Sequence, residues 1–170
     1  MRALSLDQAK DVFETTDLAS HIGGIDWQYP GPVPNYLLPK DSGAKIGLAR
    51  AIANTFLDRG PTVLWITEVG IWPSAEQMDL FTRYRLSYGE SRTIAEAPVQ
   101  IFEVADRKEL TSILCLGLFF VWGLEVMNLD RSLAITVSHD EWIEYRFAPG
   151  NDALIQYFEK HFDWMSTKGK

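Results

Sequence analysis

The sequence contains a single cysteine, Cys115, and only three histidines in 170 residues. One cysteine excludes a disulfide framework and favours a reducing compartment. The histidines, His21, His139 and His161, fall in separate segments without the spacing of a zinc site. We therefore predict no metal and no cofactor, although Mg²⁺ held by carboxylates stays open, because such ligands need no fixed spacing.

Glycine-rich phosphate loops, dinucleotide-binding fingerprints and kinase motifs are also missing. Basic residues are fewer than acidic ones, 16 against 23, and they form no stripe. A nucleic-acid partner is not expected, because proteins that bind nucleic acid gather lysines and arginines against the phosphates. The net charge of −7 favours solubility or a protein partner with a basic surface, whose association opposite charge accelerates.

Long apolar runs are absent as well. The most apolar uncharged stretch, 113–124, has twelve residues, whereas a membrane-spanning helix needs about 20. The first residues lack the apolar core of a secretory signal and reach acids at Asp7, Asp11 and Glu14. We expect a cytoplasmic protein with no membrane partner.

Aromatic residues, by contrast, are abundant: six Trp, six Tyr and nine Phe. The length fits one domain that can fold without metals or disulfides. Apolar periodicity and capping residues predict helices near 42–60, 74–88, 106–118 and from 151 on, and strands near 62–68, 119–127, 133–138 and 142–147. We predict a single α+β domain whose mixed sheet ends in a three-stranded antiparallel meander, with helices packed mainly on one face.

Side-chain patterns also assign faces within the helices. Ser5 and Gln8 form a predicted capping box for a short first helix. In the helix near 42–60, Lys45 and Arg50 are predicted on the solvent side. The predicted core positions of the helix near 74–88 are Leu80, Phe81, Tyr84 and Tyr88.

Residues 21–40 are rich in proline and glycine and are predicted to form a long loop without helix or central strand. The segment carries Trp27, Tyr29 and Tyr36, more apolar mass than a polar linker would hold. We expect it to pack on the domain and cover part of the core. A lid or peptide-binding role is the alternative.

The last two strands predict their own register. Apolar residues alternate along both, from Leu133 to Val137 and from Ile143 to Phe147. A slip of one residue would turn either set to water, so Val137 is predicted to pair with Ile143. This register leaves 139–141 as a short hairpin loop.

The hairpin loop holds a motif that suggests chemistry: Ser138, His139, Asp140 and Glu141. A catalytic triad needs side chains that converge in space, whereas side chains at a hairpin tip splay outward. No Gly-x-Ser-x-Gly elbow is present either. We interpret the motif as a solvated turn, with a binding tip or a metal-assisted site completed by another loop as alternatives.

Glu68 is predicted at the C-terminal end of the most buried strand, shortly before Trp72 and a helix start. In open α/β sheets, ligands bind at such strand ends. Arg83, Arg85 and Arg92 follow in the sequence; of the two on the helix, one is expected to face the sheet edge and the other water. An arginine paired with Glu68 would be structural, which we favour, whereas an unpaired one would suggest an anionic ligand.

The hairpin register puts four residues on the sheet face away from the core, Thr136, Trp142, Glu144 and Arg146, with Glu125 as a further candidate. An exposed tryptophan beside an arginine is typical of an interface anchor. The predicted binding residues are Trp27, Trp72, Arg83, Arg92, Trp142, Glu144 and Arg146.

Two segments resemble a family of small uncharacterised bacterial proteins. They are 65–74, Trp-Ile-Thr-Glu-Val-Gly-Ile-Trp-Pro-Ser, and 138–142, Ser-His-Asp-Glu-Trp. The resemblance implies a bacterial origin and no known activity. In size, charge and class the chain is also similar to the acidic α+β immunity proteins that neutralise bacterial toxins, which is an analogy of fold alone.

We predict a non-enzymatic protein, immunity-protein-like or an accessory factor, that binds a protein partner through an acidic and aromatic surface. One alternative is a small enzyme with a carboxylate-based site near Glu68 and the tip formed by His139, Asp140 and Glu141. Another is a homo-oligomer whose Trp142 face is its own interface.

Overall fold

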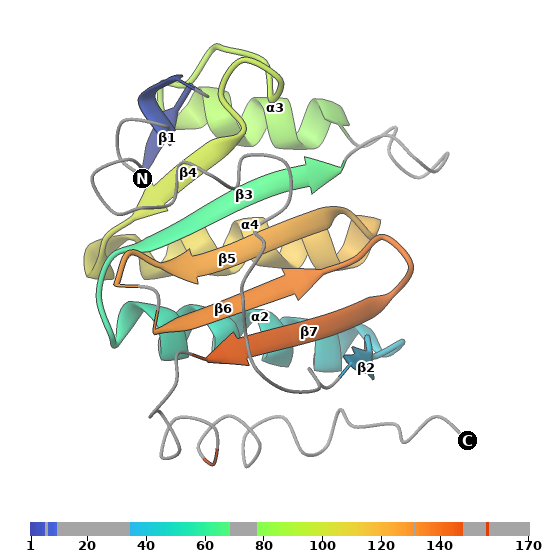
Figure 1. Ribbon diagram of the computed structural model, residues 1–170. Helices are drawn as coiled ribbons and strands as arrows, with labels where there is room; N and C mark the ends of the chain where they lie inside the picture. The colour runs from blue at the N-terminus through green and yellow to red at the C-terminus, as the bar shows by residue number, and fades with distance from the viewer. Residues whose placement is uncertain (6, 10–34, 69–77, 131, 148–155, 157–170) are drawn as a thin grey trace.

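Seven strands form one sheet in the computed structural model, which describes residues 1–5, 7–9, 35–68, 78–130, 132–147 and 156 (Figure 1). The strands are β1 (Arg2–Leu4), β2 (Asn35–Leu37), β3 (Thr62–Glu68), β4 (Val99–Phe102), β5 (Gly123–Asn128), β6 (Leu133–Val137) and β7 (Trp142–Phe147). They lie in the order β1-β4-β3-β5-β6-β7-β2, and every described pair is antiparallel. The α+β class and the β5–β7 meander are confirmed, but the prediction of a mixed sheet was wrong.

The helices are α2 (Ser42–Leu57), α3 (Met78–Ser87) and α4 (Arg107–Phe120), the last preceded by a 3₁₀ turn at Val104–Asp106. Helices α2 and α4 lie side by side behind the sheet in Figure 1. Phe81 of α3 belongs to the same core cluster, so α2, α3 and α4 share one face of the sheet, as predicted, whereas Ala9 of the helical residues 7–9 packs in the cluster on the other face. None of them is long and apolar enough to cross a membrane.

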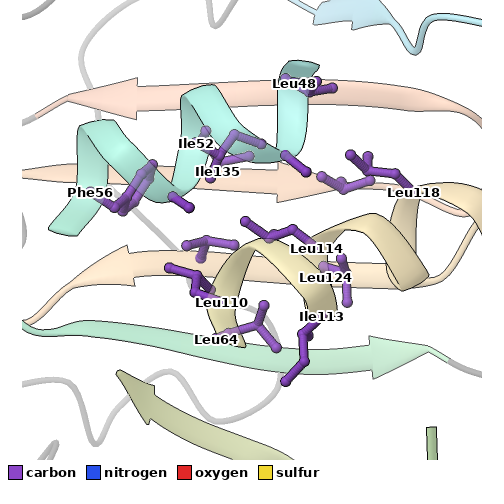
Figure 2. Packing of buried hydrophobic residues seen from close by; sticks show 14 of the residues in the cluster. Leu48, Ile52, Phe56, Leu64, Leu110, Ile113, Leu114, Leu118, Leu124 and Ile135 are labelled. Atoms are coloured by element: carbon purple, nitrogen blue, oxygen red, sulfur yellow. The ribbon is translucent and has the colours of Figure 1, made fainter. Parts of the chain in front are cut away.

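The main core lies between these helices and the sheet. Every residue of the predicted α4 stripe is buried: Leu110, Ile113, Leu114, Gly117 and Leu118. Figure 2 shows the leucines and the isoleucine of this stripe beside α2 residues and over strands β3, β5 and β6. Gly117 allows the close approach of α4 to β5, because a Cβ there would lie 2.3 Å from Cδ1 of Leu124.

Helix α2 begins as predicted, with the Asp41 side chain accepting a hydrogen bond from the backbone N–H of Ala44 (2.8 Å). The solvent position predicted for Lys45 was wrong, because Lys45 is buried while Arg50 is exposed. The ammonium group of Lys45 donates to the carbonyl of Leu118 (2.8 Å). This carbonyl belongs to the last turn of α4, where unpaired backbone oxygens and the helix dipole favour a cation.

Helix α4 is longer than predicted. It continues past Leu118 to Phe120, in place of the predicted start of a strand, and ends at Val121 with φ of 54°. The N–H of Trp122 donates to the Gly117 carbonyl (3.0 Å) and closes this end. Helices commonly end with glycine in the left-handed conformation, so a valine there left no signal of the boundary in the sequence.

Part of the segment predicted as a loop is a strand. Asn35–Leu37 forms the edge strand β2, which pairs with β7. The Tyr36 ring stacks on Tyr145, with centroids 5.3 Å apart and the hydroxyl oxygens 2.7 Å apart. Leu38 is buried, so this end of the segment covers the core as expected. The rest of it, through residue 34, lies outside the described residues.

The predicted capping box near the N-terminus is confirmed. The N–H of Ser5 donates to Oε1 of Gln8 (3.0 Å), and the N–H of Gln8 donates to Oγ of Ser5 (3.2 Å). The predicted helix start near residue 74 lies outside the described residues, as does the predicted helix from 151 on, except for residue 156, which is helical.

Candidate functional site

The sheet has a helix face and an opposite face, which we call the outer face. On β1, β4 and β3 and the neighbouring positions of β5 and β6, the outer face is apolar and buried: Leu4, Val63, Val99, Ile101, Met127 and Ala134. Polar side chains take over along the meander. There, Glu125 pairs with Thr136, and Thr136 pairs with Glu144. The outer face is therefore divided into an apolar half and a polar half.

The polar half depends on the predicted hairpin register, which is confirmed. Val137 pairs with Ile143, and Ala134 pairs with Arg146. Residues on a strand alternate between faces, so Trp142, Glu144 and Arg146 lie on the outer face as predicted. The Trp142 side chain is half-buried.

An ion pair within β7 limits the charge of this half. Arg146 donates through Nε and Nη2 to the carboxylate of Glu144, two residues away on the same strand. Both side chains are half-buried, with 22 % and 12 % of their surface exposed. Glu144 is thus already engaged by a cation, while residues 123–147 as a whole carry five acids and two arginines.

The predicted catalytic candidates gather at one end of the sheet. Glu68 ends β3 beside Gly123, and the β6–β7 turn projects at the same end (Figure 1). Strands in a sheet lie about 4.8 Å apart, so the backbones of β3 and β6, two positions apart, are separated by roughly 10 Å. The topology therefore brings Glu68 and the Ser138–Glu141 turn to the same end, while only the backbone position of Glu68 is described.

The turn itself is held by hydrogen bonds among its own residues. The N–H of Asp140 donates to Oγ of Ser138 (3.1 Å), and the N–H of Glu141 donates to the Ser138 carbonyl (3.1 Å). Glu141 has φ of 62°, which is typical of a three-residue hairpin loop with its last residue in the left-handed region. The Ser138 hydroxyl serves as a turn acceptor, which favours the turn interpretation over a nucleophile.

Exposure differs along this turn. Ser138 is buried, His139 is half-buried, and the Asp140 side chain is 63 % exposed. Nε2 of His139 lies 3.5 Å from Oδ1 of Asp140. The carbonyl of Glu141 accepts a hydrogen bond from the N–H of Leu38 (2.8 Å), which ties the turn to β2. The turn is thus a fixed part of the sheet with an acidic tip.

The two arginines of α3 divide as expected: Arg85 is buried and Arg83 is exposed. The ion pair that we favoured for Glu68 stays a prediction, because the Glu68 side chain lies outside the described part of the structure; Nη2 of Arg85 donates to the carbonyl of Ala97 (3.0 Å). Within the described part of the chain, Arg85 has no carboxylate at ion-pair distance. Its guanidinium lies over the Phe81 ring, 5.6 Å from the centroid.

Arg92 is occupied by structural contacts. Its Nε donates to Oε1 of Glu90 (2.9 Å), and its Nη2 lies 2.5 Å from Oε2. Nη2 also donates to the carbonyl of Ala3 (3.0 Å), which ties this segment to β1. The hydrogen bond from Arg92 lowers the pKa of Glu90 to about 2. A binding role for Arg92 stays a prediction.

The remaining candidate residues add no contact to the site in the described part of the structure. Trp27 and Trp72 lie outside the described residues. Cys115 is half-buried, and burial raises the pKa of its thiol, which disfavours a nucleophilic thiolate. In the described ranges, no group of three or more His, Cys, Asp or Glu side chains could hold a metal ion.

One residue of the outer face was not among the predicted site residues. Trp65 was assigned to a strand buried on both faces, but it is half-buried and pairs with Glu125. Trp65, Glu125, Thr136 and Glu144 thus form one cross-strand row, which we call the polar row. Alternation along β3 could have placed Trp65 on the outer face, but its pairing with β5 is not local in sequence.

No family model matches the chain, and the comparisons with curated proteins and with solved structures found no match. The resemblance to uncharacterised bacterial proteins remains an expectation.

Proposed function

We propose that this is a non-enzymatic binding protein that docks the polar half of its outer face against a protein with a basic surface. The observation that carries the proposal is the polar row, in which Glu125 pairs with Trp65 and a second carboxylate, Glu144, lies two strands further along, beyond Thr136. Trp142, two residues before Glu144 on β7, lies on the same face. Side chains fixed on strands lose little freedom on binding, which favours affinity.

The two residue types have separate tasks in such an interface. Tryptophan is among the residues that contribute most binding energy, and Trp142 is the predicted anchor. The carboxylates of Glu125 and Asp140 would attract a basic surface during the encounter and raise the association rate. A basic toxin that the protein neutralises in the cytoplasm is one partner of this chemistry.

The experiment is affinity capture at low salt from cells that express the protein, followed by binding measurements with the purified partner. Trp142→Ala should weaken binding at least about tenfold, mainly through faster dissociation. Asp140→Lys should slow association, whereas Asp79→Lys on α3, with the same change of charge, should not. Equal effects of the two lysine variants would contradict the proposal.

Self-association is the outcome that would replace this proposal with the homo-oligomer. Sedimentation of the purified chain should give a monomer that Trp142→Ala does not change. A dimer that Trp142→Ala dissociates would show that the outer face is a self-interface.

A small enzyme remains the second candidate because Glu68 and the Ser138–Glu141 turn lie at the same end of the sheet. Hydrolysis of a model ester or phosphate substrate that Glu68→Gln abolishes, with the fold unchanged, would favour it. We expect no turnover above that of the Glu68→Gln control.

A further inference from the structure

Helix α3 presents an unusual face to the domain. Phe81 and Arg85 are four residues apart, so they share one side of the helix, and both are buried, with 0 % and 2 % exposed. Leu80, Leu86 and Tyr88 are instead 45 %, 51 % and 45 % exposed. A helix that packs stably on a core buries its apolar stripe and exposes its charges. In α3 this pattern is partly reversed.

Buried polar atoms beneath α3 lack partners in the described structure. Nη2 of Arg85 and Nε2 of Gln100 both donate to the carbonyl of Ala97, at 3.0 and 3.3 Å. Nε of Arg85 and Oε1 of Gln100 are buried without a hydrogen bond, as is Nε1 of Trp122. The Trp122 and Phe81 rings pack edge to face, with centroids 5.1 Å apart. A buried polar atom without a protein partner disfavours the docked helix.

The charge of Arg85 is also poorly compensated. Burial lowers the pKa of its guanidinium, and Glu90, the carboxylate that opposes this shift most, is held by Arg92. The attraction to the Phe81 ring compensates only in part for the hydration lost by a guanidinium. In favour of docking stand the burial of Phe81 and the hydrogen bond from the Tyr84 hydroxyl to the Glu109 carbonyl (2.9 Å).

We propose that α3 is a detachable helix, which leaves the core as a unit while α2, α4 and the sheet stay folded. Undocking returns the Arg85 guanidinium to water and lets water reach Oε1 of Gln100 and Nε1 of Trp122. It also exposes Phe81 and Trp122, an apolar surface that the docked state hides. Local opening of this kind occurs in the least stable parts of a fold. The proposal concerns the helix face and is independent of the function proposed for the outer face.

The test is native-state hydrogen exchange of the full chain, read helix by helix. Backbone amides of α3 should exchange at least about tenfold faster than the buried amides of α4 and with little dependence on denaturant. If the α3 amides exchange only together with those of α4, in global unfolding, the helix does not detach and the proposal is wrong.

Two variants on α3 sharpen this test. Arg85→Met removes the buried charge but keeps an unbranched side chain over Phe81, and Gln100 still donates to the Ala97 carbonyl. We expect exchange in α3 to slow by about tenfold and exchange in α4 to stay the same. Arg83→Met, two residues away and exposed, should change neither. Faster exchange of α3 in Arg85→Met would mean that the arginine holds the helix in place, which overturns the proposal.

Discussion

Helices α3 and α4 cover the same face of one sheet with different kinds of contact. The buried side of α4 consists of five uncharged residues at helical spacing. That of α3 is centred on Phe81 and Arg85, and the polar atoms around Arg85 are incompletely paired. Membership of one layer therefore does not imply equal stability. Apolar burial dominates the attachment of α4, whereas α3 combines the burial of Phe81 with hydrogen bonds, and the segment after it is held by an ion pair.

A matched pair of leucine substitutions gives the largest predicted difference between the two helices. Leu114 of α4 is fully buried, while Leu80 of α3 is 45 % exposed. Leu114→Ala should lower the free energy of unfolding by about 3 kcal/mol, because it removes buried methyl groups and leaves a cavity. Leu80→Ala should change it by less than about 0.5 kcal/mol. Denaturant unfolding measures both, and similar losses would mean that the two helices are packed alike.

Gly117 tests how closely α4 approaches the sheet. Alanine favours a helix by about 1 kcal/mol over glycine, but a Cβ at this position would collide with Leu124. We expect Gly117→Ala to be destabilising by about 1 to 2 kcal/mol, because the packed core must shift.

A double variant separates the collision from other effects. In a Leu124→Ala background the obstructing side chain is gone, so Gly117→Ala should become neutral or stabilising. A loss of the same size in both backgrounds would place its cause elsewhere in α4.

The two helices also differ in how far their sequences predicted them. The face of α4 follows from its own residues, because the apolar spacing from Leu110 to Leu118 allows one buried side. The face of α3 was predicted only in part: Phe81 is buried and Tyr84 packs against the core as predicted, but Leu80 and Tyr88 are exposed. The buried Arg85 donates to the Ala97 carbonyl, which lies on the segment after α3. The residues of α3 themselves do not indicate this contact.

The candidate site shows the same division between local and distant information. The positions of Glu144 and Arg146 followed from alternation within one hairpin. The pairing of Trp65 with Glu125 joins β3 to β5, separated by α3, β4 and α4, so no local pattern could place the polar row. The partnership of Arg92 with the Ala3 carbonyl was equally distant in sequence.

The smallest predicted effect belongs to the ion pair that follows α3. The pKa of Glu90 is lowered from 4.5 to about 2 by its hydrogen bond from Arg92. A carboxyl group whose pKa is lowered by folding stabilises the fold at pH values above its pKa in the unfolded chain. This contribution fades as the pH falls from 4.5 to about 2. Glu90→Gln should lower the free energy of unfolding by about 1 kcal/mol at neutral pH, a modest amount because Arg92 is partly exposed, and should flatten its pH dependence over this window.

Asp140→Asn, at the exposed tip of the β6–β7 turn, serves as the control and should leave that dependence in place. If Glu90→Gln unfolds with the same pH profile as the unmodified chain, the segment after α3 is held by something other than this pair, and the contrast with the mainly apolar attachment of α4 would be weakened.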